Sequence, residues 1–300
     1  MPAESYSAGS PRRSRCGPHP TSCDAALLVL VSAGRVGEWI VRACMTLIPL
    51  TLLCVASLAA CESVRVAVPG EVAFEVDTSA GTQTAWCVGQ GPGVVLINGI
   101  GDDATSAQWI EVQSALADHS RVCRYDRLGT GRSHPPDTAG RAADQLDEEL
   151  DAVVDLAAGD APVIVIAHSF GGYLSRVYAD RHPDRVRALV FVDALDPSVG
   201  VLAGTGASTM SDVKMADEQL DLEDLEHTVQ SVVHLSQNPV VIVLSRGEGA
   251  TTSWTEGQQR LASLSSRSTL VVVPDAGHQI PSEDPVAVVT AVNDAIRMTG

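Results

Sequence analysis

A short apolar run that passes through a turn of small residues into a helical pattern constrains the fold of this chain more than any other feature. Residues 162–167 read Pro-Val-Ile-Val-Ile-Ala, a β-branched run that is too brief to form a helix of its own. The run continues through His-Ser-Phe-Gly-Gly at 168–172 and then into helical spacing over 173–180. The sequence therefore predicts a strand, a sharp turn that carries Ser169, and a helix.

The turn resembles the nucleophile elbow of the α/β-hydrolases. That elbow reads G-x-S-x-G, and residues 167–171 read Ala-His-Ser-Phe-Gly, with Ala167 in place of the first glycine. Small residues two positions before and after the nucleophile are needed because the strand and the helix nearly touch there. The pentapeptide alone also fits a serine in an ordinary strand-to-helix turn of another α/β domain, so the rest of the chain has to decide.

Residues 1–60 do not resemble a globular core. Residues 1–24 are rich in Ser, Pro, Gly and Arg and have no apolar period, which predicts disorder or a start codon placed too early. Residues 45–60 are apolar and follow the basic Arg42. Their length and Pro49 favour the hydrophobic region of a signal peptide over a membrane span.

This apolar segment ends in Leu-Ala-Ala-Cys at residues 58–61, which resembles the lipobox of bacterial lipoproteins. The resemblance implies cleavage before Cys61, lipid attachment to that cysteine, and an exported protein tethered to the membrane of the cell envelope. The alternative is an uncleaved N-terminal anchor, which gives nearly the same location. A start near Val41 or Met45 would produce a signal peptide of normal length.

The remainder, residues 61–300, is long enough for one large domain, and 45% hydrophobic content of the chain is enough for a core. The chain has 20 Lys and Arg residues and 37 Asp and Glu residues. The resulting net charge of −17 disfavours nucleic acid and anionic lipid headgroups as partners.

Strand and helix patterns alternate after residue 61. They predict an eight-stranded, mostly parallel sheet with helices on both faces, and residues 196–238 read as a small helical cap. Together with the elbow, this arrangement resembles the α/β-hydrolase fold. The expected strands cover 72–77, 82–88, 93–98, 121–126, 162–167, 187–193, 239–244 and 268–273. The expected helices cover 104–117, 137–156, 173–180, 255–264 and 284–298.

Two cysteines, Cys87 and Cys123, remain after the proposed cleavage site, and both lie in strand patterns. In the fold that the resemblance implies, these strands are neighbours. A cross-strand disulfide then suits an oxidising compartment, and two buried free thiols are the alternative.

The loop after the third strand resembles the His-Gly-x-Gly motif of the same family. Residues 98–101 read Asn-Gly-Ile-Gly, with Asn98 in place of His. The resemblance implies that the N–H groups of Ile100 and Phe170 stabilise an oxyanion, whereas the alternative is a plain glycine turn. Residues 126–133 resemble the family's D-x-x-G-x-G-x-S turn at the rim of the site, and no Lys follows their glycines as a nucleotide loop would require.

By the same resemblance, Ser169 is the nucleophile and His278, on the loop after the last strand, is its base. A serine hydroxyl needs an imidazole within hydrogen-bond reach because it is a poor nucleophile at neutral pH. Many relatives place the acid after the seventh strand, but Ala250 stands where that Asp is expected. Asp193, at the end of the sixth strand, is therefore the first candidate acid, Glu248 the second and Asp196 the third.

These residues predict two-step acyl transfer on a small-molecule carboxylic ester, with neither a metal nor an organic cofactor. An amidase or peptidase, a thioesterase or a cofactor-free haloperoxidase would use the same triad, and the fold also serves non-catalytic binding proteins. Hydrolytic dehalogenases and epoxide hydrolases are disfavoured because they use Asp at the position of Ser169. The expected cap contains no aromatic residue, so its lining of the pocket should be aliphatic and polar.

Overall fold

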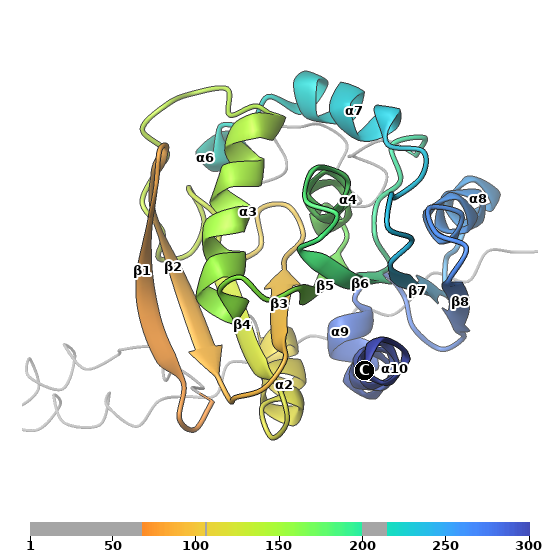
Figure 1. Cartoon of the computed structure of the whole chain (residues 1–300). Helices are drawn as coiled ribbons and strands as arrows, with labels where there is room; N and C mark the ends of the chain where they lie inside the picture. Colours follow the sequence, from red (N-terminus) through yellow and green to blue (C-terminus); the bar gives the residue numbers. More distant parts are fainter. Residues whose placement is uncertain (1–67, 106, 200–214) are drawn as a thin grey trace, which may run out of the picture. The chain divides into compact units, whose positions relative to one another are not determined.

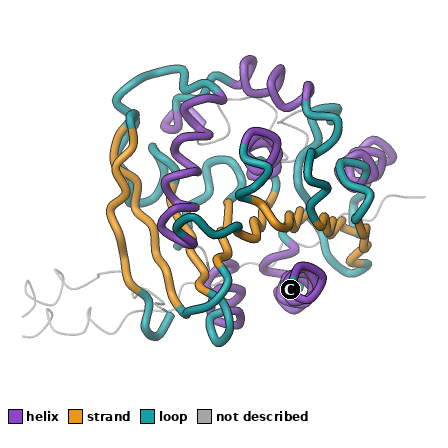
Figure 2. The backbone as a smooth tube through the Cα atoms, viewed as in Figure 1, coloured by secondary structure: helices purple, strands orange, loops and turns teal. Residues whose placement is uncertain are grey.

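The computed structural model describes residues 68–105, 107–199 and 215–300 (Figure 1). The predicted signal peptide, the lipobox with Cys61, and residues 200–214 of the predicted cap lie outside the described residues. Within the described residues, strands and helices alternate along most of the chain, as the tube drawing shows (Figure 2).

An eight-stranded sheet forms the centre of the fold, in the order β1-β2-β4-β3-β5-β6-β7-β8. Strands β1, β2 and β4 pair antiparallel, and every pairing from β4 to β8 is parallel. The predicted mostly parallel sheet is therefore confirmed. The strands are β1 (Val72–Thr78), β2 (Gly81–Val88), β3 (Gly93–Ile97), β4 (Arg121–Asp126), β5 (Val163–His168), β6 (Val186–Val192), β7 (Val240–Arg246) and β8 (Ser268–Val273).

Helices cover both faces of this sheet (Figure 1). Helices α3, α4 and α8 pack on one face, and α2 and α10 pack on the other. Helices α6 and α7 lie within the predicted cap, and α7 contacts α3 and α4. The helices are α2 (Ala107–Leu116), α3 (Ala143–Ala158), α4 (Gly171–Arg181), α6 (Met215–Glu218), α7 (Leu222–Ser231), α8 (Thr252–Ala262), α9 (Ile280–Glu283) and α10 (Pro285–Thr299).

The central strands are buried on both faces, which explains their continuous apolar sequences. In β3, Val95 and Ile97 face the core beneath α3 and α4, whereas Val94 and Leu96 face the core beneath α2 and α10. This alternation follows from the two-residue period of a strand. The sequence could therefore locate these strands from β-branched runs alone.

Cys87 in β2 lies directly opposite Cys123 in β4, and the structure joins them as a disulfide. Both side chains are buried in the core beneath α3. The pairing follows from the antiparallel register of the two strands, which places the two sulfur atoms on the same face of the sheet.

The predicted helix over 137–156 is wrong at its start, because α3 begins only at Ala143. Gly140 has a φ of 66°, in the left-handed region, which interrupts helical geometry. The preceding segment pairs with other parts of the chain instead: the Asp137 N–H donates to Ala80 O, and the Arg141 N–H donates to Gln219 O. The short helix α9 was not predicted either.

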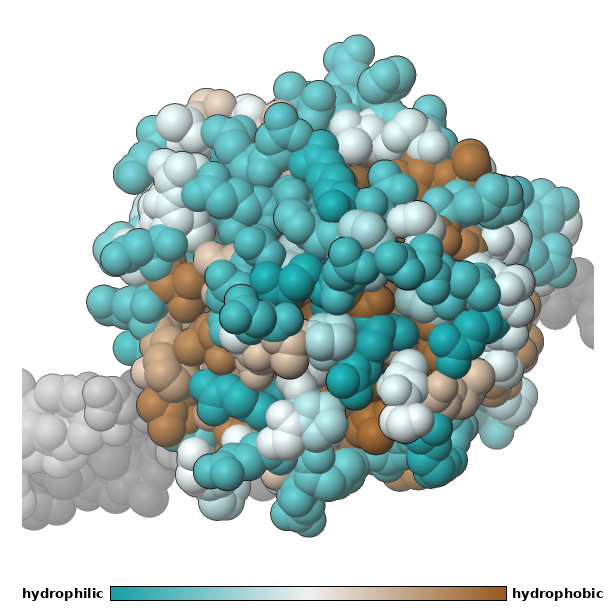
Figure 3. Space-filling model, viewed as in Figure 1, coloured by the Kyte–Doolittle hydropathy of each residue, from teal (hydrophilic) through white to brown (hydrophobic). Residues whose placement is uncertain are grey.

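Hydrophilic side chains cover most of the face shown in Figure 3, with apolar residues in small groups between them. Among the described residues, none of the helices combines the length and the apolar character that a membrane crossing requires.

Candidate active site

Ser169 lies at the carboxyl end of β5 in a strained backbone conformation, with a φ of 53°. The turn is tight enough to require glycine next to it. A Cβ atom at Gly171 would lie 2.8 Å from the Ile97 carbonyl oxygen of β3. Strand β5 therefore passes straight into α4, and the serine is left at the edge of the sheet where the parallel strands end.

Three of the predicted residues meet at this edge. The Ser169 hydroxyl lies 3.0 Å from His278 Nε2, and His278 Nδ1 lies 2.7 Å from Asp193 Oδ2. Asp193 follows β6 and His278 follows β8, so three separate strands contribute one side chain each. Because the carboxylate can only accept, the imidazole proton belongs on Nδ1, which leaves Nε2 free to accept the serine proton.

The Asp193 carboxylate is fully buried and accepts hydrogen bonds from four donors. Oδ1 accepts from the Arg246 backbone N–H at 2.9 Å and from the Trp254 indole at 2.8 Å. Oδ2 accepts from Arg246 Nε at 2.6 Å and from the His278 imidazole. These four bonds fix the orientation of the carboxylate beside the imidazole.

Arg246 Nη2 also lies 3.0 Å from His278 Nδ1. Both nitrogens carry hydrogen when Nδ1 donates to Asp193, so this contact is repulsive, and the shorter bond to the carboxylate prevails. The guanidinium is held over the Trp254 ring, with its central carbon 3.8 Å from the ring centroid. Arg246 and Trp254 thus enclose the imidazole and the carboxylate from one side.

The two other acid candidates have no hydrogen bond to the imidazole among the described residues. Glu248 is exposed, and within the described part of the chain its carboxylate has no hydrogen bond to His278. Asp196 is buried but pairs with Arg176 at 3.3 Å and Arg260 at 2.9 Å. Of the three carboxylates considered from the sequence, the structure brings only Asp193 to the imidazole.

The two predicted oxyanion donors come from different elements. Ile100 lies on the loop after β3, and Phe170 is the N-cap residue that directly precedes α4. Within the described segments, the structure gives the backbone N–H groups of Ile100 and Phe170 no acceptor. Asn98 stands where the resembled motif has His. Its amide nitrogen donates to Tyr125 O at 3.3 Å.

His168 precedes the serine but points away from it, into the core. Its Nε2–H donates to the His278 carbonyl at 2.9 Å and so ties β5 to the loop that carries the imidazole. Burial is the main cause that lowers the pKa of His168 to about 3, and the charge of nearby His278 acts in the same direction. His168 is therefore neutral near neutral pH, and it can hold the loop without adding charge to the site.

Sequence reasoning missed Arg246, Trp254 and the loop-holding role of His168. A strand-end position was the only signal for Arg246, and the sequence around Trp254 shows nothing beyond the start of a helix. No group of three or more His, Cys, Asp and Glu side chains within residues 68–105, 107–199 and 215–300 could hold a metal ion.

Comparisons with known proteins point to one fold. The family described as "alpha/beta hydrolase fold" matches residues 92–222. The uncharacterized protein YqjL of Bacillus subtilis (strain 168) is 26% identical over 215 residues, which cover 67% of this chain and 83% of that protein.

A second relative is the 2-hydroxy-6-oxo-2,4-heptadienoate hydrolase of Pseudomonas putida. It is 35% identical over 121 residues, which cover 40% of this chain and 44% of that enzyme. Among solved structures, the carboxylesterase CesB from Bacillus subtilis superposes with a TM-score of 0.58 at 17% identity, covering 75% of this chain and 91% of that one. The likeness to CesB concerns the fold alone.

Proposed function

We propose that this chain, a hydrolase with the α/β-hydrolase fold, cleaves carboxylic esters by an acyl-enzyme mechanism. Ser169 is the nucleophile, His278 the general base and acid, and Asp193 the residue that orients the imidazole. One observation carries the proposal: a continuous chain of two hydrogen bonds runs from the Ser169 hydroxyl through His278 to the buried Asp193 carboxylate.

In the first step, His278 Nε2 removes the proton as the Ser169 oxygen attacks the substrate carbonyl carbon. The resulting imidazolium is stabilised by Asp193, which already accepts from Nδ1. Negative charge develops on the carbonyl oxygen, and in this proposal it is received by the N–H groups of Ile100 and Phe170, which have no acceptor among the described residues. Phe170 is also the N-cap residue of α4, so the positive end of the helix dipole favours the same charge.

In the second half of the reaction, His278 gives its proton to the leaving alcohol, and the acyl group stays on Ser169. Water then enters, loses a proton to His278 and attacks the acyl carbon. The acid departs and the serine recovers its proton. Ser169, His278 and Asp193 suffice for these reaction steps because each proton moves only between His278 Nε2 and an oxygen atom next to it.

An ester is proposed ahead of an amide because an alcohol leaves more easily than an amine from the same intermediate. The test compares the full chain on p-nitrophenyl butyrate, methyl butyrate, p-nitrobutyranilide and a butyryl thioester, with Ser169→Ala as the blank. We expect both oxygen esters to be hydrolysed with higher kcat/KM than the anilide and the thioester. Faster turnover of the anilide or thioester, or turnover of bromide and peroxide alone, would contradict the ester proposal.

We further propose that the chain is exported and carries lipid on Cys61, as the lipobox at residues 58–61 indicates. Expression in a bacterium fed radioactive palmitate provides the test. We expect label on the wild-type chain and none on Cys61→Ser. Equal labelling of both forms, or a wild-type chain without label that remains in the membrane, would favour an uncleaved anchor.

A further inference from the structure

Arg127 reaches the loop that carries the proposed oxyanion donor Ile100. It is the first residue after β4, and its guanidinium is almost fully buried. Nη1 donates to the Asn98 carbonyl at 2.9 Å, and Nη2 donates to the Gly99 carbonyl at 2.6 Å. Both carbonyls belong to the two residues that directly precede Ile100.

The bond to Gly99 O fixes the direction of the Ile100 N–H, because both groups belong to one peptide unit. A trans peptide is planar, and its C=O and N–H point in opposite directions. Holding the Gly99 oxygen against Arg127 therefore aims the Ile100 N–H away from Arg127. A cationic donor at the oxygen also polarises the peptide, which makes its N–H a better donor.

Glu218, in α6, holds the next peptide unit. Its Oε1 accepts from the Gly101 N–H at 2.7 Å and from Arg127 Nη2 at 3.0 Å, and its Oε2 accepts from Arg127 Nε at 2.8 Å. Glu218 is fully buried, so its charge and that of Arg127 compensate one another away from water. The peptide units before and after Ile100 are thus fixed by one ion pair.

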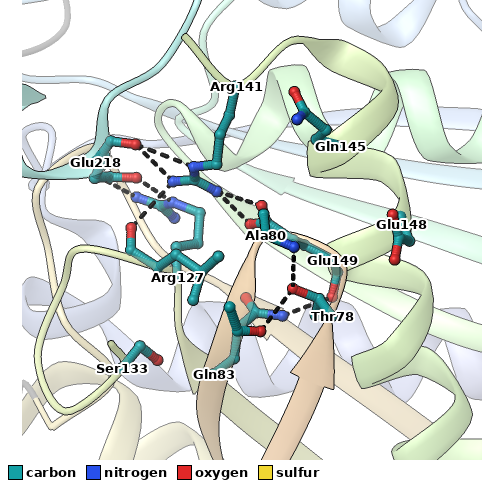
Figure 4. A network of polar contacts seen from close by, with 12 residues as sticks. Thr78, Ala80, Gln83, Arg127, Ser133, Arg141, Gln145, Glu148, Glu149 and Glu218 are labelled. Atoms are coloured by element: carbon teal, nitrogen blue, oxygen red, sulfur yellow. Dashed lines mark hydrogen bonds and ion pairs between the residues drawn. The ribbon is translucent and has the colours of Figure 1, made fainter. Parts of the chain in front are cut away.

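A second arginine anchors the segment that carries Glu218 (Figure 4). Arg141 Nη2 donates to the Glu218 backbone carbonyl at 2.7 Å, while its Nη1 pairs with Glu149 of α3. The close view shows Arg127 and Arg141 both directed at Glu218. The end of α6 is therefore seated by its backbone on Arg141 and by its side chain on Arg127.

We propose that Arg127 and Glu218 are positioning residues for the oxyanion donor, and that the oxyanion hole is complete only when the Glu218 segment of the predicted cap is seated. This inference rests on the proposed function, because it assigns the Ile100 N–H to the oxyanion. Neither side chain touches the substrate. Each acts on the donor through the backbone of residues 98–101.

The test measures kcat and KM for p-nitrophenyl butyrate with the full chain. The principal variant is the double change Arg127→Met with Glu218→Leu, which leaves neither charge buried without a partner. Removing one oxyanion donor costs roughly 10²–10³ in rate, so loosening it should lower kcat about 10- to 10²-fold with KM little changed. The affinity for a trifluoromethyl ketone, which forms an oxyanion on the enzyme, should fall by the same factor.

Glu218→Gln is the second variant, because its amide oxygen still accepts from Gly101. We expect a smaller loss of kcat than in the double variant. Glu71→Gln is the matched control: Glu71 forms a buried ion pair with Arg124 at 2.6 Å, and within the described residues no hydrogen bond joins its side chain to residues 98–101. It should keep the wild-type kcat even where its melting temperature falls.

Two other results would contradict different parts of this proposal. A double variant with wild-type kcat, or a Glu71→Gln control that loses kcat as much, would overturn the positioning role and leave the proposed function intact. If Ser169→Ala hydrolysed the ester as fast as the wild type, that result would overturn the proposed function, and the inference with it.

Discussion

Replacing Asp193 by Asn is expected to lower kcat for ester hydrolysis by about 10⁴, because the imidazole would then adopt the wrong tautomer. An Asn side chain at this position has one accepting oxygen. With the oxygen facing Arg246 N and the Trp254 indole, as Oδ1 does now, the NH₂ group faces His278 Nδ1. Nδ1 would then have to accept, so Nε2 would carry the proton and could not take that of Ser169.

The opposite orientation of the Asn side chain fails as well. It would direct NH₂ at the Arg246 N–H and the indole N–H, leaving donors buried against donors, which costs about 1–3 kcal/mol per unsatisfied group. Melting curves and steady-state kinetics on Asp193→Asn separate the effect on stability from that on kcat. Glu248→Gln is the control and should keep the wild-type kcat, because the Glu248 side chain is exposed and, in the part of the chain that the structure describes, has no hydrogen bond to the imidazole. A loss of kcat in Glu248→Gln alone would reassign the acid.

Replacing Ser169 by Ala should have the largest effect, a fall in kcat of about 10⁶, since loss of the nucleophile removes the covalent route altogether. The change deletes one oxygen that bonds only to His278 Nε2 within the described residues. Alanine keeps a Cβ at the same strained φ, so the backbone of the turn should be unchanged. The melting temperature should therefore stay close to that of the wild type.

Binding provides the control for Ser169→Ala. A product carboxylate, measured by calorimetry, should still bind because the Ile100 and Phe170 N–H groups remain. Residual hydrolysis within tenfold of the wild type, after removal of any contaminating esterase, would show that another residue is the nucleophile.

The sequence predicted the fold closely because its central strands are buried on both faces. Such strands must be apolar over most of their length, as residues 163–167 and 240–244 are, so they are recognisable without knowledge of their partners. The disulfide partners could be named because strand order decides which cysteines are neighbours. Asp193 could be ranked first among three candidate acids because the parallel strands present their carboxyl ends along one edge.

Other parts could not be predicted, because they depend on contacts between residues far apart in the chain. Glu218 lies 117 residues from Gly101, and nothing near either position signals their hydrogen bond. Trp254 lies 61 residues from Asp193 and could serve equally well as a core side chain. The late start of α3 has a similar origin, since Arg141 pairs with the segment next to Glu218 instead of entering the helix.

Labelling of the full chain with a fluorophosphonate, followed by mass spectrometry of the modified peptide, tests directly whether Ser169 is an activated nucleophile. Such probes react covalently with a serine only where a base and an oxyanion hole activate it. We expect one modified residue, Ser169, in the wild type, with no labelling of Ser169→Ala or His278→Ala and strongly slowed labelling of Asp193→Asn. A folded wild-type chain that does not react, or that reacts at another serine, would contradict this expectation.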